Sequence, residues 1–288
     1  MPSLLINGAN IKYEEMGAGM PVALTPGGRA GMEGVRSLAE RLAAHYRVII
    51  YDRRNCGASD VVIGGEPSEQ EIWADDLHEL LKRLTALPAY VGGGSAGCRV
   101  SLLLAIRHPE AVKGLLLWWV TGGAVAAERL GYTYYEQFVE MAARGGMQEV
   151  IASEFFAERI RENPSNRRRL LAMAPQEFVD VMRKWRASFT ADKPVIGATE
   201  AELRAIRVPT AIVPGNDEIH PKAVGENLHR LLSRSELFPH PWEPGERELL
   251  MQQDSQRPGE VQAERLAAVY LPFLAKMEKA GSPSLRSR

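Results

Sequence analysis

The chain has 288 residues, enough for one large α/β domain or for a core domain with an insertion. Its 35 basic and 36 acidic residues balance, so the sequence lacks the basic stripe that nucleic-acid binding requires. The apolar content of 45% is ordinary for a soluble globular protein, and the longest apolar run, residues 114–120, is too short to cross a membrane.

The cysteines and the first residues favour a reducing compartment. Cys56 and Cys98 form neither a disulfide framework nor a CxxC metal motif. The first eight residues lack the basic segment and apolar core of a signal peptide. We therefore expect a cytoplasmic protein that carries no metal ion and no other cofactor.

The first 120 residues alternate predicted strands with predicted helices. Apolar and β-branched runs predict strands, in chain order, over residues 3–15 (two strands joined at Asn7-Gly8), 22–25, 47–51, 89–91 and 114–120. Apolar residues at helical spacing predict helices over residues 35–45, 75–84 and 98–107. This alternation favours a parallel sheet with helices on both faces.

The character of the sequence changes at about residue 122. Residues 122–199 have helical patterns, many aromatic residues and no strand signal. Strands return over residues 210–213 and 236–238, residues 227–232 are the predicted end of a helix, and residues 261–277 are a closing amphipathic helix. A helical insertion in an α/β sheet is typical of a lid over an active site. We expect a core of residues 1–121 and 206–278, a helical cap of residues 122–205 and a disordered tail of residues 279–288.

The most informative motif is Gly93-Gly94-Ser95-Ala96-Gly97, a G-x-S-x-G pattern. It lies between a predicted strand and a predicted helix, which is the context that a nucleophile elbow needs. A serine at such a sharp turn has a strained backbone, so the flanking positions must be small. A structural glycine turn that happens to carry a serine is the alternative interpretation.

Further motifs carry a resemblance to the α/β-hydrolase superfamily, in the capped subgroup that includes esterases, C–C bond hydrolases and haloperoxidase-like members. They are the elbow, Pro26-Gly27-Gly28, the loop over residues 52–59, His108-Pro109-Glu110 and the turn over residues 215–221. The resemblance spans residues 3–277. It implies an α/β fold with a mostly parallel, eight-stranded sheet flanked by helices and a helical cap insertion.

The resemblance also implies roles for particular residues. Ser95 matches the nucleophile and Asp217 the catalytic acid, in the chain order of this fold. The backbone N–H groups of Gly28 and Ala96 match the oxyanion hole. For Asp217, a turn residue whose carboxylate binds nearby backbone N–H groups is the alternative interpretation.

The catalytic histidine is the departure from the family pattern. The family has a Gly-His step after the last strand, and here Gly245-Glu246 stands near that position. We expect His240, between two prolines close to the strand end, to be the base, with His220 as the alternative. A third interpretation is that neither histidine is a base.

These motifs and the resemblance favour a serine hydrolase that acts on an ester or another carbonyl-activated bond of a small, largely apolar substrate through an acyl-Ser95 intermediate. We expect Arg29, Trp119 and Tyr135 to contact this substrate, and the protein could be a homodimer. Two alternatives remain: a non-hydrolytic enzyme of the same fold (a lyase, isomerase or cofactor-free oxygenase), and a non-catalytic ligand-binding member. Neither nucleic acid nor membrane is expected as a partner.

Overall fold

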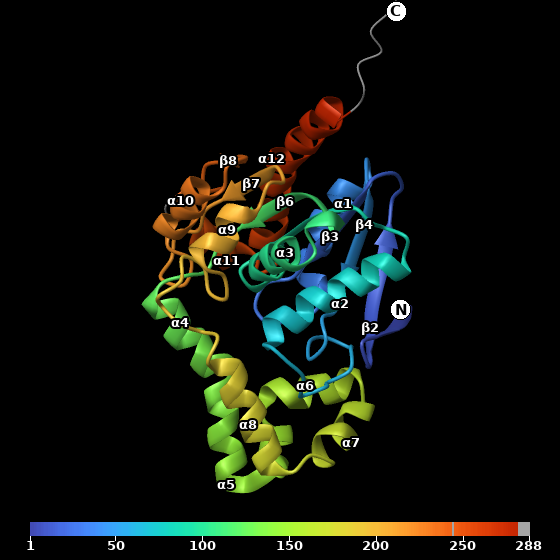
Figure 1. Cartoon of the computed structure of the whole chain (residues 1–288), viewed down its shortest axis with the longest axis vertical. Coiled ribbons are helices and arrows are strands. Elements are labelled where there is room, and N and C mark those ends of the chain that lie inside the picture. Colours follow the sequence, from blue (N-terminus) through green and yellow to red (C-terminus); the bar gives the residue numbers. More distant parts are fainter. Residues whose placement is uncertain (244, 282–288) are drawn as a thin grey trace, which may run out of the picture.

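An eight-stranded sheet lies at the centre of the structure, a computed structural model that describes residues 1–243 and 245–281 (Figure 1). The strand order is β1-β2-β4-β3-β5-β6-β7-β8; β1 and β2 pair antiparallel with each other, β2 pairs antiparallel with β4, and every later pair is parallel. The strands are β1 (Ser3–Ile6), β2 (Ala9–Met16), β3 (Pro21–Thr25), β4 (Arg47–Tyr51), β5 (Ala89–Gly94), β6 (Val112–Trp118), β7 (Thr210–Val213) and β8 (Ser235–Leu237). This confirms the predicted mostly parallel sheet.

Helices flank this sheet and extend beyond it. The helices are α1 (Arg36–Ala43), α2 (Glu69–Arg83), α3 (Ala96–Arg107), α4 (Ala124–Gly131), α5 (Gln137–Ala152), α6 (Glu154–Glu162), α7 (Ser165–Leu171), α8 (Pro175–Arg186), α9 (Glu200–Ala205), α10 (Lys222–Leu231), α11 (Glu246–Gln253) and α12 (Arg257–Gly281). Shorter turns are η1 (Met32–Val35), η2 (Pro109–Ala111) and the π-helical turn η3 (Tyr132–Glu136). No described helix is both long and apolar enough to cross a bilayer.

The two faces of the sheet bury alternate residues of each strand, as the pleat requires. On one face Ile49 and Leu115 pack with α2, α3, α9 and α10. On the other face Ile50 and Leu116 pack with α1 and α12. Apolar side chains therefore fill both faces, which explains why these strands are nearly continuous apolar runs in the sequence.

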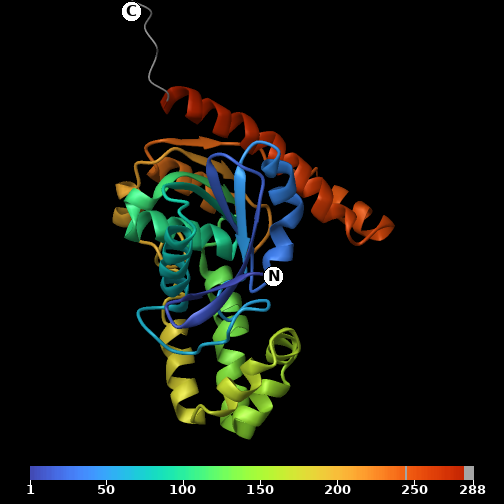
Figure 2. The ribbon, with the colours of Figure 1, turned by 90° about the vertical axis from the view of Figure 1, so that its right-hand side faces the viewer.

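Helices α4 to α8 form a separate group that extends away from the sheet (Figures 1 and 2). They have an apolar core of their own, which includes the buried rings of Phe138, Phe156, Phe178 and Trp185. Helix α9 lies inside the range predicted for the cap, yet its Leu203 is buried in the cluster on the sheet. Of the predicted tail, residues 279–281 belong to α12 and residues 282–288 lie outside the described part of the chain.

Two helices differ from the sequence expectation. Helix α2 begins at Glu69 rather than near residue 75, because the hydroxyl of Ser68 caps it by accepting a hydrogen bond from the Glu71 N–H at 3.3 Å. Helix α11 was not expected. It contains no buried residue, so it lacks the apolar periodicity by which a helix is predicted.

Candidate active site

Ser95 lies at the sharp turn between β5 and α3, where the sequence predicts it. Its backbone has φ 54° and ψ −111°, a conformation that costs a non-glycine residue about 1–3 kcal/mol. The neighbouring glycines make the turn possible, because a Cβ on Gly93 would lie 2.6 Å and one on Gly97 2.1 Å from the carbonyl oxygen of Thr25. The turn is therefore packed directly against the end of β3.

His220 joins Ser95 to Asp217. Its Nε2 lies 2.9 Å from Ser95 Oγ, and its Nδ1 lies 2.9 Å from Asp217 Oδ2. A carboxylate only accepts, so Nδ1–H donates to Asp217 and the lone pair of Nε2 accepts from the Ser95 hydroxyl. The imidazole is thereby held in the tautomer that a general base for Ser95 needs.

The loop after β7 folds back on itself and thereby positions His220. Asp217 Oδ1 accepts hydrogen bonds from the backbone N–H groups of Ile219 and His220, both at 2.8 Å. Gly215 is required there, since a Cβ on it would lie 2.2 Å from the His220 carbonyl oxygen. Burial raises the pKa of the Asp217 carboxyl, but the hydrogen bonds from the His220 side chain and the loop backbone outweigh it and the net pKa is lowered.

His240, the first choice from the sequence, is not brought to Ser95. Its Nδ1 is engaged with the backbone of Trp242 two residues later. The position of the family's Gly-His step is taken by Glu246, whose carboxylate pairs with Arg265 of α12. The expectation that His240 partners Ser95 is corrected on this geometry: His220, on the loop after β7, occupies the place with its Nε2 2.9 Å from Ser95 Oγ.

The predicted oxyanion residues belong to the two segments that meet at the serine, the loop after β3 and the start of α3. Gly28 follows β3 with φ +50°, and a Cβ on the preceding Gly27 would lie 3.5 Å from Ser95 Cβ. Ala96 is the first residue of α3 and is buried. The loop after β3 therefore runs against the elbow, as two donors for one oxyanion require.

Of the three predicted substrate contacts, only Trp119 lies beside Ser95. Its ring centroid is 6.0 Å from that of His220, and it lines the same cavity as Ser95. Arg29 instead pairs with the buried carboxylate of Glu69, and the Tyr135 hydroxyl donates to the same carboxylate at 3.0 Å. Neither Arg29 nor Tyr135 lines the cavity at Ser95, because Glu69 holds both side chains.

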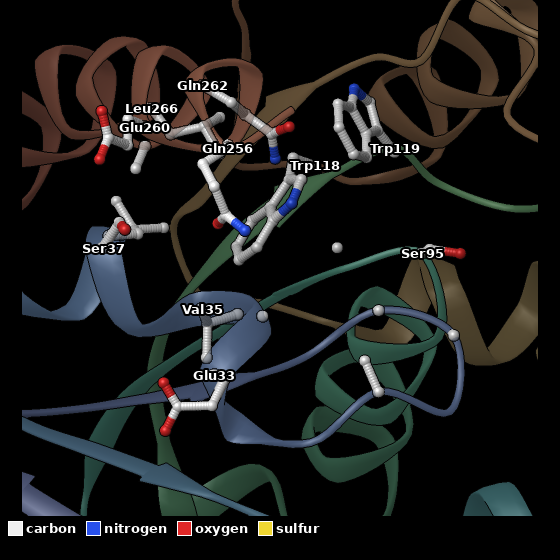
Figure 3. A pocket seen from close by; sticks show the side chains of 18 of the residues that line it. Glu33, Val35, Ser37, Ser95, Trp118, Trp119, Gln256, Glu260, Gln262 and Leu266 are labelled. Carbon is white, nitrogen blue, oxygen red and sulfur yellow. The ribbon is translucent and has the colours of Figure 1, made fainter. Parts of the chain in front are cut away.

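A cavity of about 540 Å³ opens at Ser95 (Figure 3). One wall comes from η1 and α1 and the opposite wall from the start of α12, with Trp118 between them. The sequence did not predict that α12 lines the cavity, because the pattern of polar and apolar residues from Gln256 to Leu266 does not indicate which of them face a cavity. The apolar lining residues include Val35, Leu38, Trp118, Trp119, Ala263 and Leu266, and the polar ones include Glu33, Gln256, Glu260 and Gln262.

Side chains of the types that bind metal ions are grouped away from this cavity. Within the described ranges, one group of three side chains has its ligand atoms within 4.8 Å of one another: His78, His108 and Glu110. The rings of His78 and His108 are stacked with centroids 3.9 Å apart, so their nitrogen lone pairs lie in parallel planes and do not converge on one ion. None of the three lines the cavity at Ser95.

Comparison with known proteins agrees with the fold. A family model described as the alpha/beta hydrolase fold matches residues 21–118, the segment from β3 to β6 that contains Ser95. A solved thermophilic esterase from Thermogutta terrifontis superposes with a TM-score of 0.64 at 23% identity, over 96% of this chain and 98% of that one. The chain has the α/β-hydrolase fold. At this identity the solved structure supports the fold alone.

Two curated relatives of this α/β-hydrolase-fold chain are named as hydrolases. The uncharacterized hydrolase YraK of Bacillus subtilis is 35% identical over 155 residues, which are 52% of this chain and 55% of that protein. The chain thus matches little more than half of that relative's length. The 2-hydroxymuconate semialdehyde hydrolase of a Pseudomonas species is 26% identical over 252 residues, 81% of this chain and 83% of that protein.

Proposed function

We propose that this protein is a serine hydrolase that cleaves an ester or another carbonyl-activated bond of a small, largely apolar molecule through an acyl-Ser95 intermediate. The observation that carries the proposal is the bridge of His220 between Ser95 Oγ and Asp217. Nucleophile, base and orienting acid are recognised by this geometry rather than by sequence position. The names of the hydrolase relatives support the same class of reaction.

The reaction follows from the hydrogen bonds. His220 Nε2 takes the proton of the Ser95 hydroxyl while Oγ bonds to the carbonyl carbon, and Asp217 stabilises the imidazolium. The N–H groups of Gly28 and Ala96 hold the oxyanion until it collapses and the leaving group departs with the proton from His220. His220 then takes a proton from water as the water oxygen bonds to the acyl carbon, and it returns that proton to Ser95 Oγ as the acid product leaves. The protein side chains supply every proton transfer in this scheme.

The lining of the cavity supports an apolar substrate. Leu38, Ala263 and Leu266 are buried and face the space next to Ser95. A cavity of about 540 Å³ is within the usual range for a small-molecule site. In this proposal helices α4 to α8 serve as the cap, and the segment η3 between α4 and α5 reaches the oxyanion loop, since a Cβ on Gly28 would lie 3.8 Å from the Tyr134 hydroxyl.

Hydrolysis in labelled water tests the proposal against its closest alternative. Turnover of a panel of p-nitrophenyl esters and of a C–C substrate is followed in water enriched in ¹⁸O, and mass spectrometry measures the label in the acid product. We expect one labelled oxygen per turnover. Turnover without label would favour a lyase, isomerase or oxygenase, and ligand binding without any turnover would favour a non-catalytic protein.

A further inference from the structure

Two buried guanidinium groups hold the carbonyl groups of the loop that carries Gly28. Arg53 Nη2 donates to the carbonyl oxygen of Gly28 at 2.9 Å and lies 3.4 Å from those of Gly27 and Ala30. Arg159 Nη2 donates to the carbonyl oxygen of Arg29 at 2.6 Å. Four successive carbonyl groups, of residues 27–30, are thus held by arginine side chains.

These hydrogen bonds fix the direction of the Gly28 N–H. In a trans peptide the C=O and N–H groups point in opposite directions. The peptide that joins Gly27 and Gly28 is not among the cis bonds of the chain, so its N–H points away from Arg53 while its carbonyl faces Arg53. Gly28 and Ser95 line the same cavity. The loop is therefore held from the side opposite to the site where an oxyanion would form.

The second guanidinium comes from the group of helices beyond the sheet. Arg159 belongs to α6, and its side chain is only 6% exposed. Its Nη1 donates to the carbonyl oxygen of Phe155 at 3.0 Å and pairs with Glu158, while its Cζ lies 3.8 Å over the Phe155 ring. These contacts fix the guanidinium on α6, so the bond to Arg29 transmits the position of α6 to the loop.

The side chain of Arg29 attaches the loop to the same group of helices a second time. It pairs with Glu69, which also accepts a hydrogen bond from Tyr135 of η3. The Arg29 guanidinium lies 5.1 Å from the ring centroids of both Tyr134 and Phe155. Burial of a guanidinium is costly unless hydrogen bonds and aromatic faces compensate it, so these contacts specify one arrangement of the loop.

We propose that Arg159 is a positioning residue through which the helices beyond the sheet set the direction of the Gly28 N–H, so that the oxyanion site is complete only when α6 is seated on the loop. This inference rests on the proposed function, because it gives the N–H a role only if Ser95 forms a tetrahedral intermediate. Misplacing a donor by about 1 Å costs up to about a hundredfold in rate.

The test compares Arg159→Met with Arg169→Met. Arg169 of α7 also joins this group of helices to the core, by a 2.8 Å ion pair with Asp60, but it does not contact residues 27–30. For both variants, the kcat and KM for an ester substrate and the Ki of a trifluoromethyl ketone, which forms an oxyanion on the serine, are measured. We expect Arg159→Met to lower kcat and to raise the Ki of the ketone by the same factor of about ten or more, while KM stays within twofold of wild type. Arg169→Met should leave kcat, KM and Ki within twofold of wild type.

Other results would overturn the inference. It is wrong if Arg159→Met changes KM alone, leaves ketone binding intact, or behaves like Arg169→Met. If Arg159→Met does not fold, Arg159→Gln replaces it, because its amide ends two bonds short of the Nη2 that reaches the Arg29 carbonyl oxygen. A folded Gln variant with wild-type kcat and Ki also contradicts the inference. A wild-type protein that is inactive and does not react with a fluorophosphonate would instead refute the proposed function, so the two failures are distinguishable.

Discussion

His220 Nε2 lies 2.9 Å from Ser95 Oγ, although 125 positions separate the two residues in the chain. The same imidazole binds Asp217 only three positions earlier. A tight turn after β7 and a sharp turn after β5 therefore meet at the carboxyl edge of the sheet, where ligand sites of open α/β sheets are found.

The role of His220 is tested by comparing two histidine variants. We expect His220→Ala to lower kcat/KM by about a thousandfold or more, because Ser95 loses its base. His240→Ala is the control, since His240 bonds only within its own loop among the contacts described. It should stay within about twofold of wild type. Equal loss in both variants, or loss in His240→Ala alone, would contradict the assignment.

Asp217 gives a pH-dependent prediction. Its folded-state pKa is lowered, so it contributes stability that is fully present above its ordinary value of 3.8 and is lost as pH falls through the lower folded value. We expect Asp217→Asn to reduce kcat by about 10²–10⁴, since it no longer stabilises the imidazolium. The stability gap between the two proteins, from urea unfolding at several pH values, should narrow below pH 3.8. A difference in unfolding free energy that increases below pH 3.8 would contradict the lowered pKa of Asp217.

Gly97→Ala tests how closely the elbow packs on β3. The added Cβ would lie 2.1 Å from the Thr25 carbonyl oxygen, so the turn must shift, at a cost of about 3 kcal/mol. Gly259→Ala is a matched control on α12, because a Cβ there meets nothing within 4 Å. It should be neutral or slightly stabilising. Denaturant unfolding measures both, and equal stability of the two variants would count against the packing described.

Ala263→Phe tests which space receives the substrate. Ala263 lines the cavity beside Ser95, so a phenyl ring should reduce kcat/KM for p-nitrophenyl octanoate at least tenfold more than for the acetate. Ala267→Phe makes the same change one turn further along α12, at a residue that is equally buried but does not line the cavity. It should leave the octanoate-to-acetate ratio unchanged. An unchanged ratio in both variants would place the substrate elsewhere.

Local chemistry made the elbow and the acid turn predictable from the sequence. The elbow motif lies within five consecutive residues, from Gly93 to Gly97, and the strand and helix beside it have strong apolar patterns. Asp217 was open to two interpretations, a turn residue or an acid. Its carboxylate both accepts loop N–H bonds and contacts His220, so the two interpretations do not exclude each other.

The identity of the base and the side chains that line the cavity depend on contacts between segments that are distant in the sequence, so local patterns do not predict them. His220 and His240 are both loop histidines near strand ends, and only the path of each loop decides which one reaches Ser95. Arg29 follows Gly28 within the oxyanion loop, but the buried carboxylate of Glu69, forty positions later, binds its side chain away from the cavity. No local periodicity encodes such pairings.

Covalent labelling of Ser95 tests the central claim most directly. Wild-type protein, Ser95→Ala and His220→Ala are treated with a fluorophosphonate, and the modified peptide is identified by mass spectrometry. The account predicts a single adduct on Ser95 in the wild type, none in Ser95→Ala, and a labelling rate at least a hundredfold lower in His220→Ala. Wild-type protein that resists the probe under conditions that label a control esterase, or an adduct that persists in Ser95→Ala, would contradict it.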